Sequence, residues 1–428
     1  MSILRPSLTV FVPERGPIRP LAGCYLIDGV GTGLWMATSV LYFTRSLHLP
    51  AAQVGLGLSA AGLAGLAGAV PLGHIADRYG LRRVGLGLMA AQAVLVACYG
   101  ALRSFWLFLL VSCLFVLAQR GSNAVRNALL GVSVSAERRL RTRAYTRSIA
   151  NVGFALGALL AVPVLHADTR TAYLVAVFAN AGSFVLAGGL LTLLPAVPPR
   201  RPVAGEPRWV ALRDRRYVAM TALTGLLSLH KPVLTVALPL WVAQRTDAPR
   251  IVVSVLLVVN TVLTVLLQVP LSRGADGLAG GVRTVRRSGV ALAVACVLLG
   301  LASGRSTGLA VGLLVAGAAV LTVGELWQSA GGWGLSYDLA PTDRYGQYQG
   351  VYALGNGIRD TFGPATVTVL ALVVGRPGWL LLAVVFAVVG LAMAPVLSAL
   401  DPSRQHSRSD RPSAGTSPAG PPAGTPGS

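Results

Sequence analysis

The sequence predicts an all-α membrane protein in which twelve transmembrane helices form two pseudo-symmetric six-helix bundles. Of its 428 residues, 54% are hydrophobic and only 12% are charged, which is too apolar for a soluble domain of this length. A helix that crosses a bilayer needs roughly 20 mostly apolar residues. The runs that meet this requirement lie near 21–44, 52–74, 84–102, 105–131, 147–166, 171–194, 218–243, 249–272, 288–304, 308–331, 348–374 and 378–400.

One long polar segment divides these runs into two groups of six. It covers 195–217 and reads PAVPPRRPVAGEPRWVALRDRRY. We therefore expect a cytoplasmic N-terminus at 1–20, six-helix bundles at 21–194 and 218–400, and a central cytoplasmic loop between the bundles. The C-terminal tail, 401–428, is rich in Pro, Gly, Ser and Ala and has no apolar period. Such a composition predicts a disordered tail.

The basic residues are distributed as in a membrane protein. The net charge of +21 could indicate a nucleic-acid partner, but 35 of the 36 basic residues are arginines and the other is Lys231. With the N-terminus inside, 25 lie in cytoplasmic segments, 7 in outside loops and 4 within spans. This positive-inside bias predicts a multi-pass protein of the inner (plasma) membrane with both termini in the cytoplasm. The basic residues then lie beside anionic lipid headgroups, and we expect no nucleic-acid partner.

The two halves resemble each other around one short segment. Residues 71–77 (PLGHIAD) match residues 270–276 (PLSRGAD) at four of seven positions, at an offset of 199. Many transporter folds consist of repeated halves with the substrate site between them. The repeat therefore favours the arrangement in two bundles.

The segment between the second and third spans carries the most specific motif of the chain. Residues 73–83 read GHIADRYGLRR, with Gly80 placed where the backbone must turn sharply. The segment resembles the signature loop of the major facilitator superfamily, G-x-L-a-D-r-x-G-r-k. Ile75 replaces the leucine, and Leu81 stands where a basic residue is common. Residues 118–128 loosely resemble the fourth-span arginine motif of that superfamily. Residues 151–163 contain Gly153 and Gly157 but not the G-P-x-x-G-G string of its drug/proton antiporters, the subgroup that the chain is expected to resemble.

The resemblance implies a gate on the cytoplasmic side, where the aspartate of the motif holds the two halves together. A carboxylate that faces a helix N-terminus gains about 0.3–1 kcal/mol, which suits a reversible contact. Alternatively, the arginines of the loop only follow the positive-inside bias. The expected gate residues are Gly73, Asp77, Arg78, Gly80, Arg82 and Arg83, with Arg273 and Asp276 in the second copy.

Several ionisable residues lie inside the predicted spans, where they are costly and are usually functional. In the fold that the resemblance implies, the first, fourth, seventh and tenth spans line a central cavity, and most of these residues fall on them. We expect Asp28 to meet Arg120 and to exchange a proton, and Lys231 to face Glu325. The full set expected for proton coupling or the substrate cavity is Asp28, Arg120, Arg126, Lys231, Glu325, Arg359 and Asp360.

Each of these residues also has a structural interpretation. Arg126 could extend its charged end to the cytoplasmic surface, and Arg359 with Asp360 could form a local pair. Asp28 could belong to a permanent pair between two spans. His230, beside Lys231, could simply hydrogen-bond a carbonyl.

Together these observations predict a secondary active transporter, with proton-coupled efflux of a small organic or drug-like molecule as the first hypothesis. Proton-coupled uptake of a small metabolite, by symport, uses the same charges. A membrane-embedded enzyme or a sensor on this fold is a further alternative, but the chain has no HExxH, GxSxG or Walker motif. We expect no enzyme activity, no metal and no cofactor, with the proton gradient as the energy source. The expected partners are the substrate, protons and the lipid bilayer, and we expect a monomer.

The predicted orientation can be tested by cysteine labelling. In Asp410→Cys, an impermeant maleimide is expected to react only after the cells are permeabilised, because an even number of spans places the tail in the cytoplasm with the N-terminus. Labelling in intact cells would refute this orientation.

Overall fold

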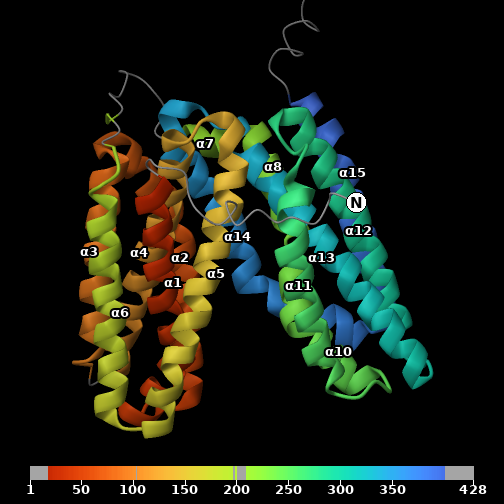
Figure 1. Cartoon of the computed structure of the whole chain (residues 1–428), viewed down its shortest axis with the longest axis horizontal. Coiled ribbons are helices and arrows are strands. Elements are labelled where there is room, and N and C mark those ends of the chain that lie inside the picture. Colours follow the sequence, from red (N-terminus) through yellow and green to blue (C-terminus); the bar gives the residue numbers. More distant parts are fainter. Residues whose placement is uncertain (1–17, 103, 196–197, 200–208, 401–428) are drawn as a thin grey trace, which may run out of the picture.

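The computed structural model describes residues 18–102, 104–195, 198–199 and 209–400 (Figure 1). Within these residues, 12 helices are long and apolar enough to cross a membrane, as the sequence predicts. The described residues contain helices and connecting turns but no strand. The predictions of a cytoplasmic N-terminus, a central loop and a disordered tail fall largely or wholly on residues outside the described ranges.

The N-terminal half contains six long helices, each of which is one span. They are α1 (Ile18–Leu41), α2 (Ala51–Tyr79), α3 (Leu81–Tyr99), α4 (Phe105–Ser133), α5 (Ala136–Ala167) and α6 (Arg170–Leu191). A short π-helix, η2 (Tyr42–Ser46), continues α1. In this half α1 packs on α5 and α6, and α4 packs on α2 and α3.

The C-terminal half begins after the short helix α7 (Val210–Arg213). Its seventh span is broken into four pieces, whereas the other five spans each contain one long helix. The seventh span consists of α8 (Arg215–Leu227), α9 (His230–Pro232), the π-helix η3 (Val233–Ala237) and α10 (Leu238–Arg245). The remaining elements are α11 (Val252–Ser272), α12 (Gly277–Leu301), α13 (Thr307–Asp338), η4 (Thr342–Arg344), α14 (Tyr345–Thr368), η5 (Val369–Val374) and α15 (Arg376–Ala399).

Several helices begin where local chemistry predicts. The side chains of Ser104, Thr169 and Asp214 each accept a hydrogen bond from the backbone N–H three residues later, which caps α4, α6 and α8. Gly80 separates α2 from α3 with φ of 100°, a conformation that glycine adopts without strain. This confirms the turn predicted at that position.

Several helices extend beyond the apolar runs from which they were predicted. The fifth span was expected near 147–166, but α5 begins at Ala136, and α12 begins at Gly277 rather than near 288. The added turns contain arginines, which hydropathy assigns to loops although arginine forms helices well. Arginine side chains can also reach the headgroup region from within the end of a span.

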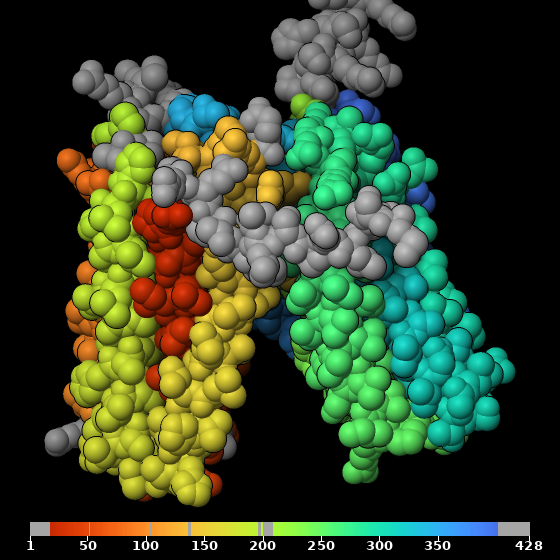
Figure 2. All heavy atoms as spheres, viewed as in Figure 1, coloured from red at the N-terminus to blue at the C-terminus, as the bar shows by residue number. Residues whose placement is uncertain are grey.

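The two halves meet at one end of the molecule and diverge toward the other. We call the end where α1 begins and α15 finishes the terminal face. Near this face α14 of the C-terminal half packs on α2 and α4 of the N-terminal half. Toward the opposite face, α5 and α11 separate and leave a cleft that widens away from the terminal face (Figure 2). The structure is therefore open on one side only.

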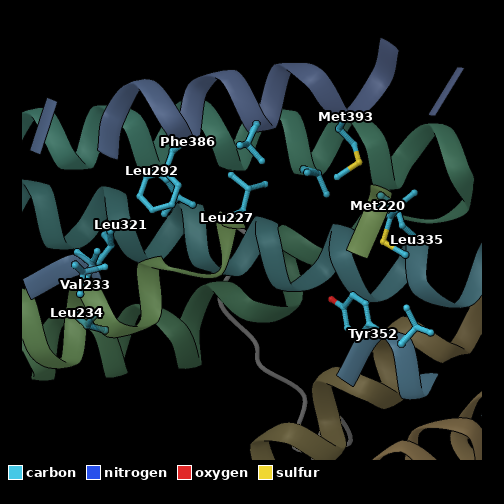
Figure 3. Packing of buried hydrophobic residues seen from close by; sticks show 14 of the residues in the cluster. Met220, Leu227, Val233, Leu234, Leu292, Leu321, Leu335, Tyr352, Phe386 and Met393 are labelled. Atoms are coloured by element: carbon cyan, nitrogen blue, oxygen red, sulfur yellow. The ribbon is translucent and has the colours of Figure 1, made fainter. Parts of the chain in front are cut away.

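The largest cluster of buried apolar side chains includes residues of both halves. In the C-terminal half, residues such as Met220, Leu292 and Phe386 interlock between α8, α12, α13 and α15 (Figure 3). In the N-terminal half, an aromatic cluster includes Trp35 stacked on Tyr99 with ring centroids 5.1 Å apart. Lipid tails are as apolar as these side chains, so close packing rather than escape from water holds such helices together.

Glycines bring the two halves into close contact along α2 and α14. Gly350 of α14 faces Ala69 and Val70 of α2, where an added Cβ would lie 2.5 Å from the carbonyl oxygen of Ala69. Gly73 and Gly346 face each other in the same way, nearer the terminal face. Small residues at such a seam let backbones approach closely.

Replacing a seam glycine should destabilise the protein. Gly350→Val is expected to cost about 1–3 kcal/mol, because the new side chain would overlap the backbone of α2 and force the halves apart. Thermal unfolding of the purified protein in detergent measures this. The matched control is Gly87→Val on α3, where an added Cβ meets nothing within 4 Å. Equal melting temperatures for both variants would contradict the proposed seam.

Candidate functional site

Asp77 joins the two halves at the terminal face. One oxygen of its carboxylate accepts a hydrogen bond from the backbone N–H of Gly346 at 2.7 Å, and the other accepts one from Gln347 at 2.8 Å. Both N–H groups belong to the first turn of α14, where the helix leaves donors unsatisfied and carries a partial positive charge. The contact expected for Asp77 from the motif is therefore present, and its part in transport stays a prediction.

The other motif residues have different surroundings. The guanidinium of Arg82 donates to the carbonyl of Leu194 at 2.8 Å, which ties the start of α3 to the end of α6. Arg78 lies against the ring of Tyr79, and Arg83 is exposed. In the part of the chain that the structure describes, Arg82 is therefore the motif arginine that hydrogen-bonds to another helix connection.

The second copy of the motif makes no comparable contact between the halves. Arg273 and Asp276 are exposed, and Asp276 precedes α12 without capping it through its side chain. Within the described residues, only the carboxylate of the first copy accepts hydrogen bonds from a helix of the other half. The two copies are therefore not equivalent in this conformation.

A buried ion pair crosses between the halves deeper in the membrane region. The guanidinium of Arg147, on α5, lies 3.0 Å from Oε1 of Glu325, on α13, and also donates to the hydroxyl of Ser329 at 2.6 Å. The amide of Asn260, on α11, donates to Oε2 of Glu325 at 3.2 Å. The carboxylate is 11% exposed, so its charge is balanced mainly by these partners.

A second ion pair crosses between α4 and α14. Arg120 lies 3.1 Å from Oδ2 of Asp360, while Arg359 binds Oδ1 of the same carboxylate through Nε at 2.8 Å. Arg359 also donates to Asn356 at 2.9 Å. The expected local pair of Arg359 and Asp360 is present, but Asp360 also binds Arg120 of the other half. Its side chain is 42% exposed.

Asp28 does not meet Arg120, contrary to the sequence prediction. Its carboxylate lies 3.0 Å from Arg126, which is buried on α4 and does not extend to the surface. Helix periodicity explains the error, because position 120 lies six residues from position 126 and therefore faces a different neighbour. Arg120 points toward α14 instead. The pair of Asp28 and Arg126 joins α1 to α4 within one half.

Lys231 and Glu325 lie within electrostatic range of each other, as expected for residues that neutralise part of each other's field, but they do not form an ion pair. Arg147 pairs with Glu325 instead, and among the described residues the Lys231 side chain has no hydrogen bond or ion pair. Lys231 is partly exposed and lies within electrostatic range of Glu325, Asp360, Arg147 and Arg359. His230 is fully buried, and its Nδ1 lies 2.9 Å from the carbonyl oxygen of Leu227, as the structural interpretation expected.

The sequence analysis missed a row of arginines on α5. Arg139, Arg143 and Arg147 were assigned to a loop, yet they recur every four residues on one helix face. Arg139 lies over the ring of Tyr345 at 5.4 Å, and Arg143 lies over Trp333 at 3.8 Å. The whole row faces the C-terminal half. Its spacing was the signal that could have identified it.

A pocket lies beside this row, between α5, α11 and α13. It contains about 370 Å³ of empty space, counting the part that is open to its surroundings. Arg143, Arg147, Gln268, Ser329 and Trp333 are among the residues that line it. The pocket therefore offers guanidinium groups, an amide and an aromatic face at the junction of the halves.

Comparison with protein families identifies the chain. The Major Facilitator Superfamily model matches residues 21–358. The chain belongs to this superfamily. A search of curated protein sequences gives no match.

Solved structures share the fold of this superfamily member at low identity. A bacterial homologue of the iron transporter ferroportin in an outward-facing state has a TM-score of 0.70 and 14% identity, covering 90% of this chain and 99% of that one. The human organic anion transporter MFSD10 has a TM-score of 0.65 and 16% identity, covering 91% and 100%. The POT family transporter PepTSo has a TM-score of 0.57 and 14% identity, covering 91% and 99%.

The family and the architecture together show that the protein is a multi-pass membrane transporter and not an enzyme. Carboxylate and arginine side chains gather where the halves meet, at the closed end of the cleft. Such groups can bind a charged solute and can exchange protons.

The contact of Asp77 with α14 should stabilise the conformation seen here. In Asp77→Asn the size is kept and the charge is lost, so the closed terminal face should lose about 1–2 kcal/mol, a roughly 5- to 30-fold shift in the conformational equilibrium. Transport by the reconstituted variant is expected to fall sharply at unchanged expression. Asp247→Asn, which alters an exposed aspartate on the opposite face, is the control. Normal transport by Asp77→Asn would leave only a structural role for the motif.

Proposed function

We propose that this transporter is a proton-coupled exporter of small organic molecules that works by alternating access. The observation that carries the proposal is the pair of carboxylates, Glu325 and Asp360, each held by an arginine of the other half. The positive-inside bias favours a cytoplasmic terminal face, so the cleft would open outward.

The two ion pairs provide a physical link between protonation and conformation. Opening of the terminal face requires α5 to leave α13 and α4 to leave α14. Arg147 and Arg120 then move away from Glu325 and Asp360. Glu325 then loses its arginine, whereas Asp360 keeps Arg359 of its own helix and loses one of its two arginines. A carboxylate that loses an arginine binds a proton more readily, while the arginine stays charged. Proton uptake would therefore favour separation of the halves, and proton release would favour the conformation seen here.

Asp28 is a weaker candidate for this role than its position in the sequence suggested. Its partner, Arg126, lies on the same half, so a rigid movement of the halves does not separate them. The pair is better placed to fix α1 against α4. This supports placing proton exchange at Glu325 and Asp360.

The structurally similar transporters differ in what their names say they carry, which are organic anions and iron. Their diversity supports transport as the general function and leaves the solute to be decided by the site itself. A symporter of the same fold would use the same carboxylates, and only the direction of the driving gradient separates the two mechanisms.

Transport by the purified protein in vesicles tests the proposal. A panel of small organic compounds is supplied outside vesicles that are acidic inside, and then outside vesicles that are acidic outside. Exchange for protons predicts uptake in the first case, whereas symport predicts uptake in the second. We expect Glu325→Gln and Asp360→Asn to keep exchange of labelled for unlabelled substrate within a few-fold but to lose at least 10-fold in pH-driven uptake, about 1.4 kcal/mol of coupling.

Asp28→Asn is the matched control, because it removes the third carboxylate without breaking a contact between the halves. We expect its pH-driven uptake to continue. If Asp28→Asn alone abolishes pH-driven uptake, the proton site lies within the N-terminal half and the proposed link is wrong. A wild-type protein without any pH dependence would exclude proton coupling altogether.

A further inference from the structure

Positive charge exceeds negative charge at the junction of the halves. The carboxylates placed there are Asp28, Glu325 and Asp360. The cationic side chains are Arg120, Arg126, Arg143, Arg147, Lys231 and Arg359. Since each carboxylate already contacts an arginine, the described side chains at this junction leave positive charge uncompensated.

Lys231 is a cation without a carboxylate partner in the described structure. Arg143, the other such cation, is covered by the ring of Trp333 and donates to the hydroxyl of Tyr25 at 3.2 Å. Lys231 has neither kind of contact, although it is partly exposed. A cation inside a span costs about 2.5–3.5 kcal/mol on insertion scales. Glu325 and Asp360 attract the ammonium from a distance, but each is already paired with an arginine, so no carboxylate among the described residues neutralises Lys231 directly.

The backbone around Lys231 is also irregular. The seventh span breaks after Leu227, resumes for three residues as α9 and then widens into the π-helix η3. Pro232 contributes no N–H to the helix, and the hydroxyl of Thr235 donates a hydrogen bond to the carbonyl of Lys231 at 3.0 Å. Irregular backbone inside a membrane is tolerated where it lines a cavity, and broken helices at mid-span commonly form substrate sites. Lys231 therefore stands at a break of the kind that binds solutes.

Lys231 lies within electrostatic range of both ion pairs that join the halves. Arg147 and Glu325 of one pair, and Asp360 with its neighbour Arg359, all act on its ammonium. The halves diverge from the terminal face into the cleft (Figure 2). The side chain of Lys231 is partly exposed, so the packing does not seal it from its surroundings.

We propose that Lys231 binds a negatively charged group of the substrate and that the transported molecules are small organic anions. This inference rests on the proposed transport function but does not depend on proton coupling. An anion at Lys231 offsets the surplus charge that the arginines create. A cation of the same size would be repelled by that surplus, and a neutral molecule would leave the ammonium uncompensated.

The single lysine of the chain allows a direct test in purified protein without any gradient. Pyridoxal phosphate and pyridoxal attach to amines through the same aldehyde, and borohydride makes the adduct permanent, but only the first carries a phosphate. Peptide mass spectrometry separates labelling of Lys231 from labelling of the N-terminal amine. We expect Lys231 to react with pyridoxal phosphate in preference to pyridoxal.

A relocated lysine corrects for the different intrinsic reactivity of the two aldehydes. The control is the double variant Lys231→Ala, Arg305→Lys, which places the only lysine at an exposed position in the loop between α12 and α13. The ratio of the two labelling rates at Lys231 is expected to exceed the ratio at position 305 by at least about 10-fold, as for an anion concentrated by a cationic cleft.

Equal ratios at the two positions would overturn the proposal, because Lys231 would then attract anions no better than a surface lysine. Absence of labelling by both reagents would also overturn it, since a substrate could not reach the ammonium. Neither outcome bears on proton coupling, which the vesicle experiment with Glu325→Gln tests separately. Loss of pH-driven transport with a high ratio at Lys231 would conversely leave the anion site intact.

Discussion

The cost of an unpaired charge in the membrane interior governs the arrangement of this protein. Solvent cannot balance a carboxylate or guanidinium there, so each needs a partner within the protein. For Glu325 and Asp360 that partner comes from the other half of the molecule. The same contacts that neutralise these charges therefore hold the two halves together, and a change of protonation at either carboxylate alters both charge balance and association.

Close packing determines where the halves can meet. The glycines of α2 and α14 let their backbones touch near the terminal face, and Asp77 adds a carboxylate at the start of α14. Among the described residues, no such close contact of glycines joins the halves near the opposite face, where the cleft opens (Figure 2). Closure at one end and opening at the other thus follow from where small residues and one capping carboxylate stand.

The sequence predicted the spans and the presence of ionisable residues within them, because both signals are local. Apolar runs identify helices that cross a bilayer, and an ionisable residue within such a run is conspicuous. Local signals failed at helix ends. Arg143 and Arg147 were assigned to a loop because the apolar part of α5 begins several residues after the helix itself begins. Local signals also failed to predict which residues form ion pairs with one another. Asp28 and Arg120 lie on the expected helices, but their rotation about the helix axes directs Arg120 to α14 and leaves Asp28 to Arg126.

By itself the sequence determined the twelve spans, the family motif, the turn at Gly80 and the surplus of positive charge, since each depends on residue type and spacing along the chain. Only the tertiary structure decided which charges neutralise one another and which is left over. Ion pairing acts over a few ångströms between helices that are distant in sequence, and it depends on depth and rotation that hydropathy does not encode. Lys231 stands apart for this reason: its lack of a partner becomes visible only when every neighbouring carboxylate has been assigned to an arginine.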